Sequence, residues 1–411
     1  MLLKRKIIKM SAAVLSAAFV GLYAAAGYYS SRLPSAVTVG NGGTVKIAGF
    51  PELSCACSPV RAVPAAETPP AAEQVTLSLF GAIPVKNIEV RKADPPVLAV
   101  GGCPFGIKLL MEGVMVTGLG NVEGENGTLS CPAMEAGIQK GDVIQLVNGT
   151  ELTSNDQLQE LISSSEGKTL ELSVEREDCR FTTSLKPVRS RRSGGWKGGM
   201  WVRDSIAGIG TMTFFDKKTG AFAGLGHPIC DSDIGGIVPV HSGEAVPVEI
   251  TEIKRGARGI PGELRGKFAF SGSLGTLGDN CRSGIYGVLN EATLAELSAD
   301  CEELTMAYRQ EITEGPAEIC TVTTGSAPER YSAEIVKVDL ASGSSSKNMV
   351  VRITDERLLE ASGGIVQGMS GSPIIQNGRL AGAVTHVFVS DPTCGYGIFA
   401  ENMVQAMDAA A

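Results

Sequence analysis

Glycine is the residue that most constrains this chain, because glycines separate short apolar runs over most of its length. The 411 residues include 51 glycines, and only 5% are aromatic. From residue 200 to the end, runs of Val, Ile, Ala and Thr of strand length alternate with Gly-containing turns, and long helical patterns are few. Short strands joined by frequent turns favour a barrel or sandwich over a doubly wound sheet. The sequence predicts a mainly β protein.

The first 32 residues differ from the rest and predict a signal or transmembrane segment. An uncharged run from Met10 to Ser31 follows four basic residues, Lys4, Arg5, Lys6 and Lys9. A basic flank before an apolar run of this length is typical of a helix that spans a membrane. The small residues Ala24 to Ala26 would also suit a signal peptidase, so removal and retention of the helix both stay open. In either case we expect the chain after residue 32 to be exported.

Charge and cysteine content exclude some classes of protein and leave one question open. A net charge of −8 argues against nucleic-acid binding as the main task. No phosphate-binding or dinucleotide motif occurs in a strand-to-helix context, so no cofactor is predicted. Residues 33–95 read as a linker and β-rich segment, in which Pro64–Glu73 is the linker. The ten cysteines suit an exported protein, but their spacing does not determine any pairing.

Residues 96–188 form one compact pattern that resembles a PDZ domain (α+β). Around the string AGIxxGDVIxxVNG, we expect a short helix from Pro132 to Ala136 and a strand from Val143 to Val147. Ser154 should then cap a helix over Asn155–Ser164, and Thr169–Val174 should form the closing strand.

The resemblance also implies a peptide-binding loop upstream of this string. Phe105-Gly106-Ile107 matches the loop whose backbone N–H groups hold a peptide's terminal carboxylate, with the peptide added as an extra strand. The alternative is that Phe105 and Ile107 are core residues. Residues 190–199, rich in Gly and Ser, are expected to link this domain to the next.

The strongest candidate for catalysis is Ser370 within Gly368-Met-Ser-Gly-Ser-Pro373. A serine between glycines in a tight turn exposes its hydroxyl, and the Gly368 and Ser370 amides could bind an oxyanion. The turn resembles the nucleophile loop of chymotrypsin-like peptidases, which implies a double β-barrel over residues 198–411. The alternative is a plain Gly/Ser surface turn.

A serine nucleophile needs a base, and His227 is the best of only three histidines because it directly follows an apolar strand. Asp355 is the candidate third member, with Asp204, Asp231 and Asp233 as rivals. His386, on the strand after the nucleophile hairpin, is either structural or part of a substrate pocket. A metal site at His227, Cys230, Asp231 and Asp233 is an alternative, but no HExxH or repeated CxxC pattern supports it, so no metal is predicted.

Long strings of this sequence resemble the stage IV sporulation protein B family, PDZ-containing serine peptidases of endospore-forming bacteria. The similarity extends from about Val75 to Met403, and its most specific strings are 202–214, Gly224-Leu-Gly-His227, 362–375 and 383–388. Carried over, the family's triad falls on His227, Asp355 and Ser370. The region from Ser35 to about Ala72 has no clear counterpart.

The resemblance implies a place in sporulation. The peptidase would cross the forespore membrane and stay anchored there or be released into the intermembrane space. It would cleave itself and a membrane-bound regulator of an intramembrane protease, which then processes a mother-cell sigma factor precursor. The PDZ domain would bind peptide C-termini or internal segments. The competing class is a non-catalytic PDZ scaffold with a degenerate peptidase fold.

Overall fold

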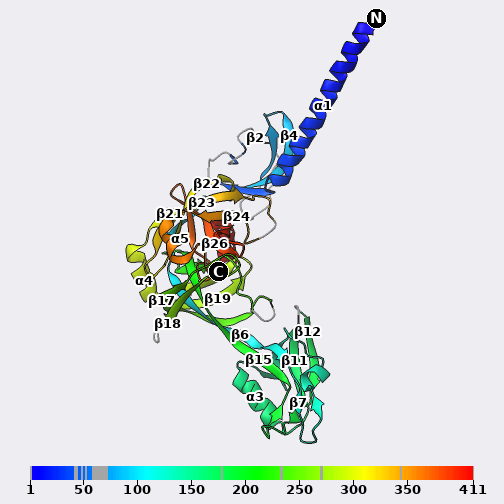
Figure 1. Cartoon of the computed structure of the whole chain (residues 1–411), viewed down its shortest axis with the longest axis vertical. Coiled ribbons are helices and arrows are strands. Elements are labelled where there is room, and N and C mark those ends of the chain that lie inside the picture. The colour runs from blue at the N-terminus through cyan, green and yellow to red at the C-terminus, as the bar shows by residue number, and fades with distance from the viewer. Residues whose placement is uncertain are drawn as a thin grey trace, which may run out of the picture.

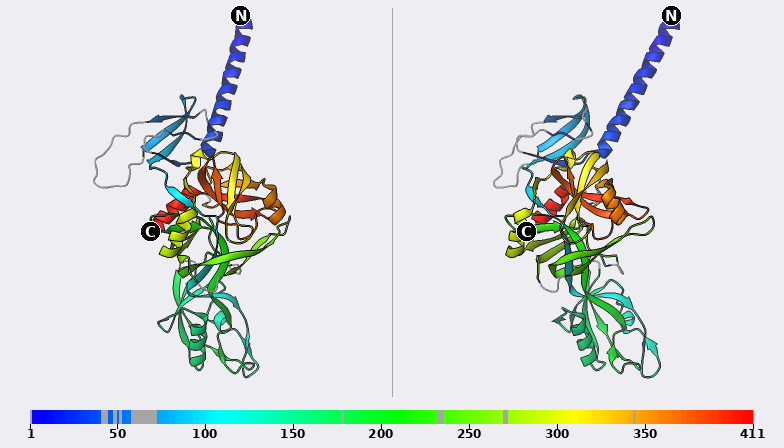
Figure 2. Two further views of the ribbon diagram at one scale, coloured as in Figure 1. Left: turned by 90° about the vertical axis from the view of Figure 1, so that its left-hand side faces the viewer. Right: turned by 60° about the vertical axis from the view of Figure 1, so that its left-hand side comes forward.

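The computed structural model describes residues 2–40, 45–47, 50, 53–57, 73–176, 179–231, 235–268, 272–342 and 345–410. Its parts follow one another along the longest axis of the molecule: a projecting helix, a small sheet, a body of two β-barrels and a lobe at the far end (Figures 1 and 2). The catalytic candidates lie in the two-barrel body, so the fold is described from that body outward.

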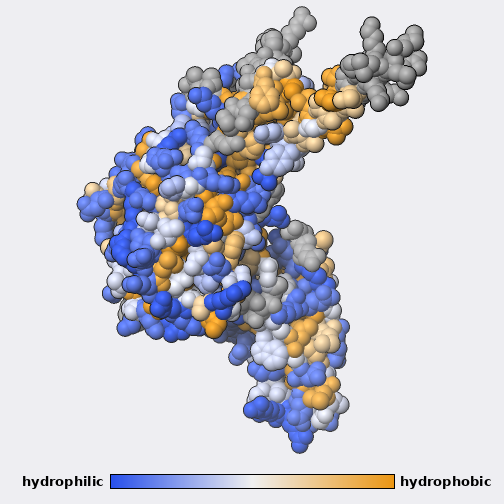
Figure 3. Space-filling model, turned by 45° about the horizontal axis from the view of Figure 1, so that its top comes forward, coloured by the Kyte–Doolittle hydropathy of each residue, from blue (hydrophilic) through white to orange (hydrophobic). Residues whose placement is uncertain are grey.

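Helix α1 (Leu2–Arg32) projects from one end of the molecule. Within it, Ala13–Arg32 is apolar and long enough to cross a membrane, and none of its most apolar stretch is buried against the body. Figure 3 shows hydrophobic residues gathered on this helix, where Phe19 and Val20 are largely exposed. The helix is consistent with the predicted signal or membrane anchor.

A four-stranded sheet joins the helix to the body, with strand order β1 (Ala36–Val39), β4 (Ile83–Lys92), β3 (Glu73–Leu79) and β2 (Leu53–Cys57). Its apolar residues share one buried cluster with the second barrel, to which the sheet contributes Val37, Leu77 and Ile88. The Gln310 side chain also donates to Thr38 O. The sheet is therefore packed onto the body.

The first barrel is a closed ring of six strands. Each strand pairs with the next in the order β6 (Pro104–Leu119), β17 (Val240–Lys254), β19 (Gly275–Cys281), β20 (Gly284–Leu289), β16 (Ala221–Gly224) and β15 (Met200–Phe215), which returns to β6. Phe105, Phe222, Leu277 and Ile285 fill its interior. Strands β5 (Val97–Val100) and β21 (Glu303–Thr305) extend the sheet beyond β15, and β18 (Glu263–Phe268) pairs with β17.

The second barrel is also closed and has six strands. The order is β22 (Gly315–Thr321), β23 (Glu329–Val338), β24 (Met349–Ile353), β27 (Asp391–Phe399), β26 (Arg379–Phe388) and β25 (Pro373–Gln376). Ile319, Ile335, Val351 and Ile374 are buried in its core. The helices of the body are α4 (Glu291–Asp300), η1 (Arg309–Glu311), α5 (Glu356–Ser362) and α6 (Ala400–Ala410). The two rings confirm the predicted double β-barrel.

The lobe at the far end has the predicted PDZ elements. These are β9 (Val143–Val147), β10 (Thr150–Glu151), β11 (Leu170–Arg176), β12 (Cys179–Leu185), α2 (Pro132–Glu135) and α3 (Asn155–Ser164). As predicted, Ser154 caps α3, because its Oγ accepts from Gln157 N at 3.2 Å. Two small hairpins complete the lobe: β7 (Val122–Glu123) with β8 (Leu129–Ser130), and β13 (Val188–Arg189) with β14 (Trp196–Lys197).

Two long strands connect the lobe to the body. β6 and β15 run side by side from the lobe into the first barrel (Figure 1). The outer part of β6 pairs with β9 of the PDZ fold, and its inner part pairs with β17 of the barrel. The strand pairings thus start the PDZ fold later than the predicted residue 96, because residues of β6 up to about Met111 pair with strands of the barrel.

Candidate active site

His227 and Ser370 come from different barrels and line one cavity. His227 lies just after β16 of the first barrel, whereas Ser370 lies in the turn before β25 of the second. Both line a cavity of about 500 Å³, together with His386 and Thr385 of β26. The structure therefore brings together the predicted nucleophile, base and second histidine.

The imidazole of His227 is oriented by a backbone carbonyl. Its Nδ1 lies 2.9 Å from Pro228 O. A carbonyl can only accept a hydrogen bond, so Nδ1 carries the proton and Nε2 is left with a free lone pair. Burial lowers the pKa of His227 below its usual value, and the Pro228 hydrogen bond opposes that shift. At neutral pH the ring is thus neutral, with its one proton on Nδ1.

A second histidine packs against the first. The ring centroids of His386 and His227 lie 4.7 Å apart, with 38° between the ring planes. Burial, with the nearby His227 and Lys347, lowers the pKa of His386 to about 4. Among the described residues its buried Nδ1 has no hydrogen-bond partner. At neutral pH His386 is therefore a neutral ring that packs beside His227.

Ser370 sits in the tight turn that the glycine pattern predicts. Gly368 and Gly371 have φ of +97° and +96°, values that favour glycine. A Cβ on Gly371 would lie 2.0 Å from Thr211 O. The Ser370 hydroxyl donates to Thr385 O at 2.7 Å. In this arrangement the hydroxyl is bound to a carbonyl, and among the described residues no hydrogen bond joins it to His227.

Two backbone N–H groups of the same turn are available to an oxyanion. Within the residues described, the N–H groups of Gly368 and Ser370 have no acceptor. The carbonyl of the peptide that carries each N–H is held: Gln367 O accepts from Leu264 N at 2.8 Å, and Met369 O from Ser372 N at 2.9 Å. Because N–H and C=O point in opposite directions across a trans peptide, these bonds fix the direction of both donors.

Strand β15 holds the turn from the other barrel. Thr211 Oγ donates to Gly368 O at 2.8 Å, and Thr211 N donates to Ser370 O at 2.9 Å. Thr213 Oγ donates to Gly371 O at 2.8 Å. Both threonines are buried. Neither was predicted as a site residue, because no local feature of the β15 sequence indicates a contact with a segment more than 150 residues away.

The structure does not join Asp355 to His227, which corrects the predicted triad. Asp355 follows β24 of the second barrel and is the N-cap of α5, where its side chain accepts from Arg357 N. Its carboxylate also accepts from the Arg357 guanidinium and from Ser332 N. Arg357 is the main cause that lowers the pKa of Asp355 to about 2. No hydrogen bond between Asp355 and His227 occurs among the described residues.

The rival acids have other partners too. Asp204 accepts from Asn155 N at 2.8 Å in the PDZ lobe. Asp231 is buried and pairs with Arg203. Asp233 lies outside the described residues. In the described structure the hydrogen bond that orients His227 is the one that its Nδ1 donates to Pro228 O.

We predict that Asp355 can lose its charge without loss of catalysis. Asp355→Asn should leave kcat/KM within about tenfold of wild type, because the Asp355 carboxylate is bound to α5 and Arg357 and not to His227. The fold should also be kept, since Asn caps a helix about as well as Asp. Asp355→Ala should lower the free energy of unfolding by about 1 kcal/mol, the usual cost of a lost N-cap. Peptide-cleavage kinetics and urea unfolding check both variants. A fall of about 10⁴ in kcat for the Asn variant would restore Asp355 to a triad role.

The predicted PDZ peptide loop at Phe105, Gly106 and Ile107 is wrong. All three are buried in β6, within the first barrel. Gly106 pairs with Ile209 of β15 on one side and with Val246 of β17 on the other. A strand paired along both edges cannot accept an added peptide strand. The alternative interpretation, in which Phe105 and Ile107 are core residues, is correct.

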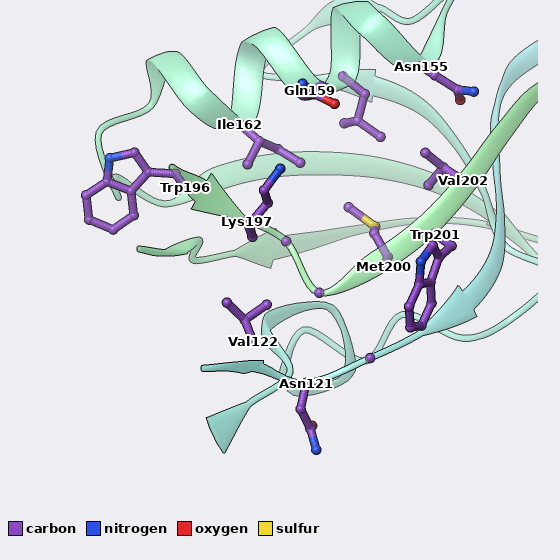
Figure 4. Close-up of a pocket in the computed structure, with 14 residues that line it drawn as sticks. Asn121, Val122, Asn155, Gln159, Ile162, Trp196, Lys197, Met200, Trp201 and Val202 are labelled. Carbon is purple, nitrogen blue, oxygen red and sulfur yellow. The ribbon is translucent and has the colours of Figure 1, made fainter. Parts of the chain in front are cut away.

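The PDZ lobe has a different groove, which was not predicted from the sequence. A cavity of about 420 Å³ lies between α3 and the segment from Trp196 to Val202. Figure 4 shows Ile162 of α3 facing Met200 and Val202 of β15 across it. The segment 190–199 is thus not a simple linker: Gly198 O accepts from Ala133 N, and Gly199 (φ +74°) has no room for a Cβ. A Gly-Gly pair before an apolar strand was the available signal.

The described residues contain no group of three or more His, Cys, Asp and Glu side chains that could hold a metal. What the body does contain is a serine in a glycine turn and a neutral histidine, facing one cavity between two six-stranded barrels. With the PDZ lobe, this body has the architecture of PDZ-containing serine peptidases.

The chain belongs to the SpoIVB peptidase S55 family. That family matches residues 194–404, which is more than half of the 411 residues, and the PDZ domain family matches residues 130–176. The family expected from the sequence is therefore confirmed.

Two more distant similarities cover only parts of the chain. A Lactococcus lactis protein named as a zinc metalloprotease, LL2128, is 36% identical over 102 residues, which are 25% of this chain and 21% of that protein. The chain thus spans about a fifth of this relative's length. The PDZ domain of the SdrC-like protein of Listeria monocytogenes is 21% identical, with a TM-score of 0.19, over 22% of this chain and 87% of that one.

Proposed function

We propose that Ser370 is the nucleophile of an endopeptidase and that His227 is its general base. The observation that supports this most directly is the shared cavity, in which Ser370 lies with a histidine whose Nε2 is free and unprotonated. In the reaction, the Ser370 hydroxyl leaves Thr385 O and gives its proton to His227 as Oγ attacks the substrate carbonyl.

The remaining steps use the same groups. The Gly368 and Ser370 N–H groups stabilise the tetrahedral oxyanion. The imidazolium of His227 keeps its Nδ1 hydrogen bond to Pro228 O and then protonates the leaving amine. A water molecule, deprotonated by the same histidine, hydrolyses the acyl-enzyme on Ser370.

We further propose the cellular role that the family suggests. The peptidase would be anchored by α1 at the forespore membrane, or released there, with its catalytic body in the intermembrane space. It would cleave itself and a membrane-bound regulator of an intramembrane protease, leading to processing of a mother-cell sigma factor precursor. The groove between α3 and β15 would bind a peptide of the substrate or of the chain itself.

Covalent labelling tests whether Ser370 is an activated nucleophile. The full chain in detergent is treated with a fluorescent fluorophosphonate, which labels activated serines. We expect wild type and Ser205→Ala to be labelled equally and Ser370→Ala to be unlabelled, because Ser205 is exposed, lies outside the cavity and donates its hydroxyl to the Asp204 carboxylate, not to a histidine. Equal labelling of Ser370→Ala, or no labelling of folded wild type, would favour a non-catalytic scaffold.

A further inference from the structure

The described residues that form the walls of the catalytic cavity carry no formal charge. Among the described residues that line it, none is Asp, Glu, Lys or Arg. Half of these twenty residues are Ala, Val, Leu or Ile, and they come from both barrels, among them Ile206, Ile209, Ile229, Val366, Val387 and Val389. The two histidines are neutral at neutral pH because burial lowers the pKa of each.

Apolar surface continues from the cavity to its rim. Val389 lines the cavity and is 52% exposed. Ile260, on the loop before β18, is 56% exposed. The two segments are tied together, since Gly259 N donates to Val389 O at 2.8 Å. An extended substrate would meet aliphatic side chains both inside and outside the cavity.

This lining discriminates by charge. A Lys, Arg, Asp or Glu side chain entering the cavity would lose water and meet no opposite charge among the described residues that line it, which costs several kcal/mol. An aliphatic side chain entering the same space gains about 25 cal/mol for each Å² of apolar surface removed from water. Both effects favour the same class of substrate.

We propose that the cavity selects an uncharged, aliphatic or aromatic residue next to the scissile bond. The proposal rests on the function proposed for Ser370 and names the substrate class of that site. The residues that set it are the aliphatic ones of the cavity wall, with Val389 at the rim.

Cleavage of a randomised peptide library by the full chain tests the proposal, with the cut bonds located by mass spectrometry. On one side of the bond, Leu, Ile, Val and Phe should exceed Lys, Arg, Asp and Glu by about 100-fold, equivalent to about 2.7 kcal/mol. Cuts that depend on Ser370 but fall equally beside charged residues would overturn the proposal and leave the peptidase function intact. Absence of both cuts and fluorophosphonate labelling would overturn the function itself.

A matched pair of variants tests whether Val389 contacts the substrate. Val389→Asp places a carboxylate at the rim and should raise cleavage beside Lys and Arg by about fivefold relative to Leu, as expected for an exposed charge pair. Val288→Asp is the control, because Val288 has a similar exposure of 49% on β20 and does not line the cavity. An equal change in both variants, or in neither, would show that Val389 does not contact the substrate.

Discussion

Replacing His227 with alanine is expected to lower kcat/KM for a peptide substrate by about 10⁴ to 10⁶, the range found when the base of a serine peptidase is removed. Without it, the Ser370 hydroxyl keeps only its hydrogen bond to the carbonyl of Thr385, which cannot act as a base. The other histidine of the cavity, His386, is a much weaker base, because burial lowers its pKa to about 4. The measurement is initial-rate cleavage of a quenched fluorescent peptide by the full chain.

The matched control is His241→Ala, because His241 is an exposed histidine of β17 outside the catalytic cavity. Its kcat/KM should equal that of wild type. If His227→Ala kept its rate within tenfold of the control, His227 could not be the base, and a different proton acceptor would have to be sought in the cavity.

The pH dependence of wild type provides a second readout of the same residue. Only neutral His227 can accept the Ser370 proton, so kcat/KM should rise with pH through the pKa of His227. Burial lowers that pKa, so the acid limb should lie below pH 6.5, the ordinary value for histidine. An acid limb above pH 6.5 would contradict the neutral, buried imidazole.

Gly368→Ala is the second variant with a large expected effect. We expect kcat to fall by about 10² to 10³ with little change in KM, the usual result of losing one oxyanion donor. Gly368 has φ +97°, and an added Cβ would lie 2.9 Å from Leu264 Cβ. Relief of this contact would move the 367–368 peptide, whose N–H is one of the two donors.

Gly378→Ala separates this effect from backbone strain. Gly378 lies in the β25–β26 turn with φ +71°, and a Cβ there would meet nothing within 4 Å. Both variants should lose stability, because alanine is strained at positive φ. Only Gly368→Ala should lose kcat. Equal kcat values for the two variants would show that the Gly368 amide does not bind the oxyanion.

Elements with strong local signals were predicted well from the sequence. The apolar run near the N-terminus, the helix Asn155–Ser164 and its Ser154 cap all occur as predicted. So does the glycine turn at Ser370, since positive φ at Gly368 and Gly371 is a local requirement of the backbone. Family strings and β-strand patterns likewise led to the double barrel.

Only the tertiary structure decided which segments meet. Phe105–Ile107 fits a PDZ loop locally, but β6 continues into the barrel and is paired on both edges there. Asp355 has a suitable position in the chain, yet its carboxylate is used by α5 and Arg357. Thr211 holds the Ser370 turn across the two barrels. Chain order and residue type set what a residue can do, whereas strand pairing between distant segments sets which partner it has.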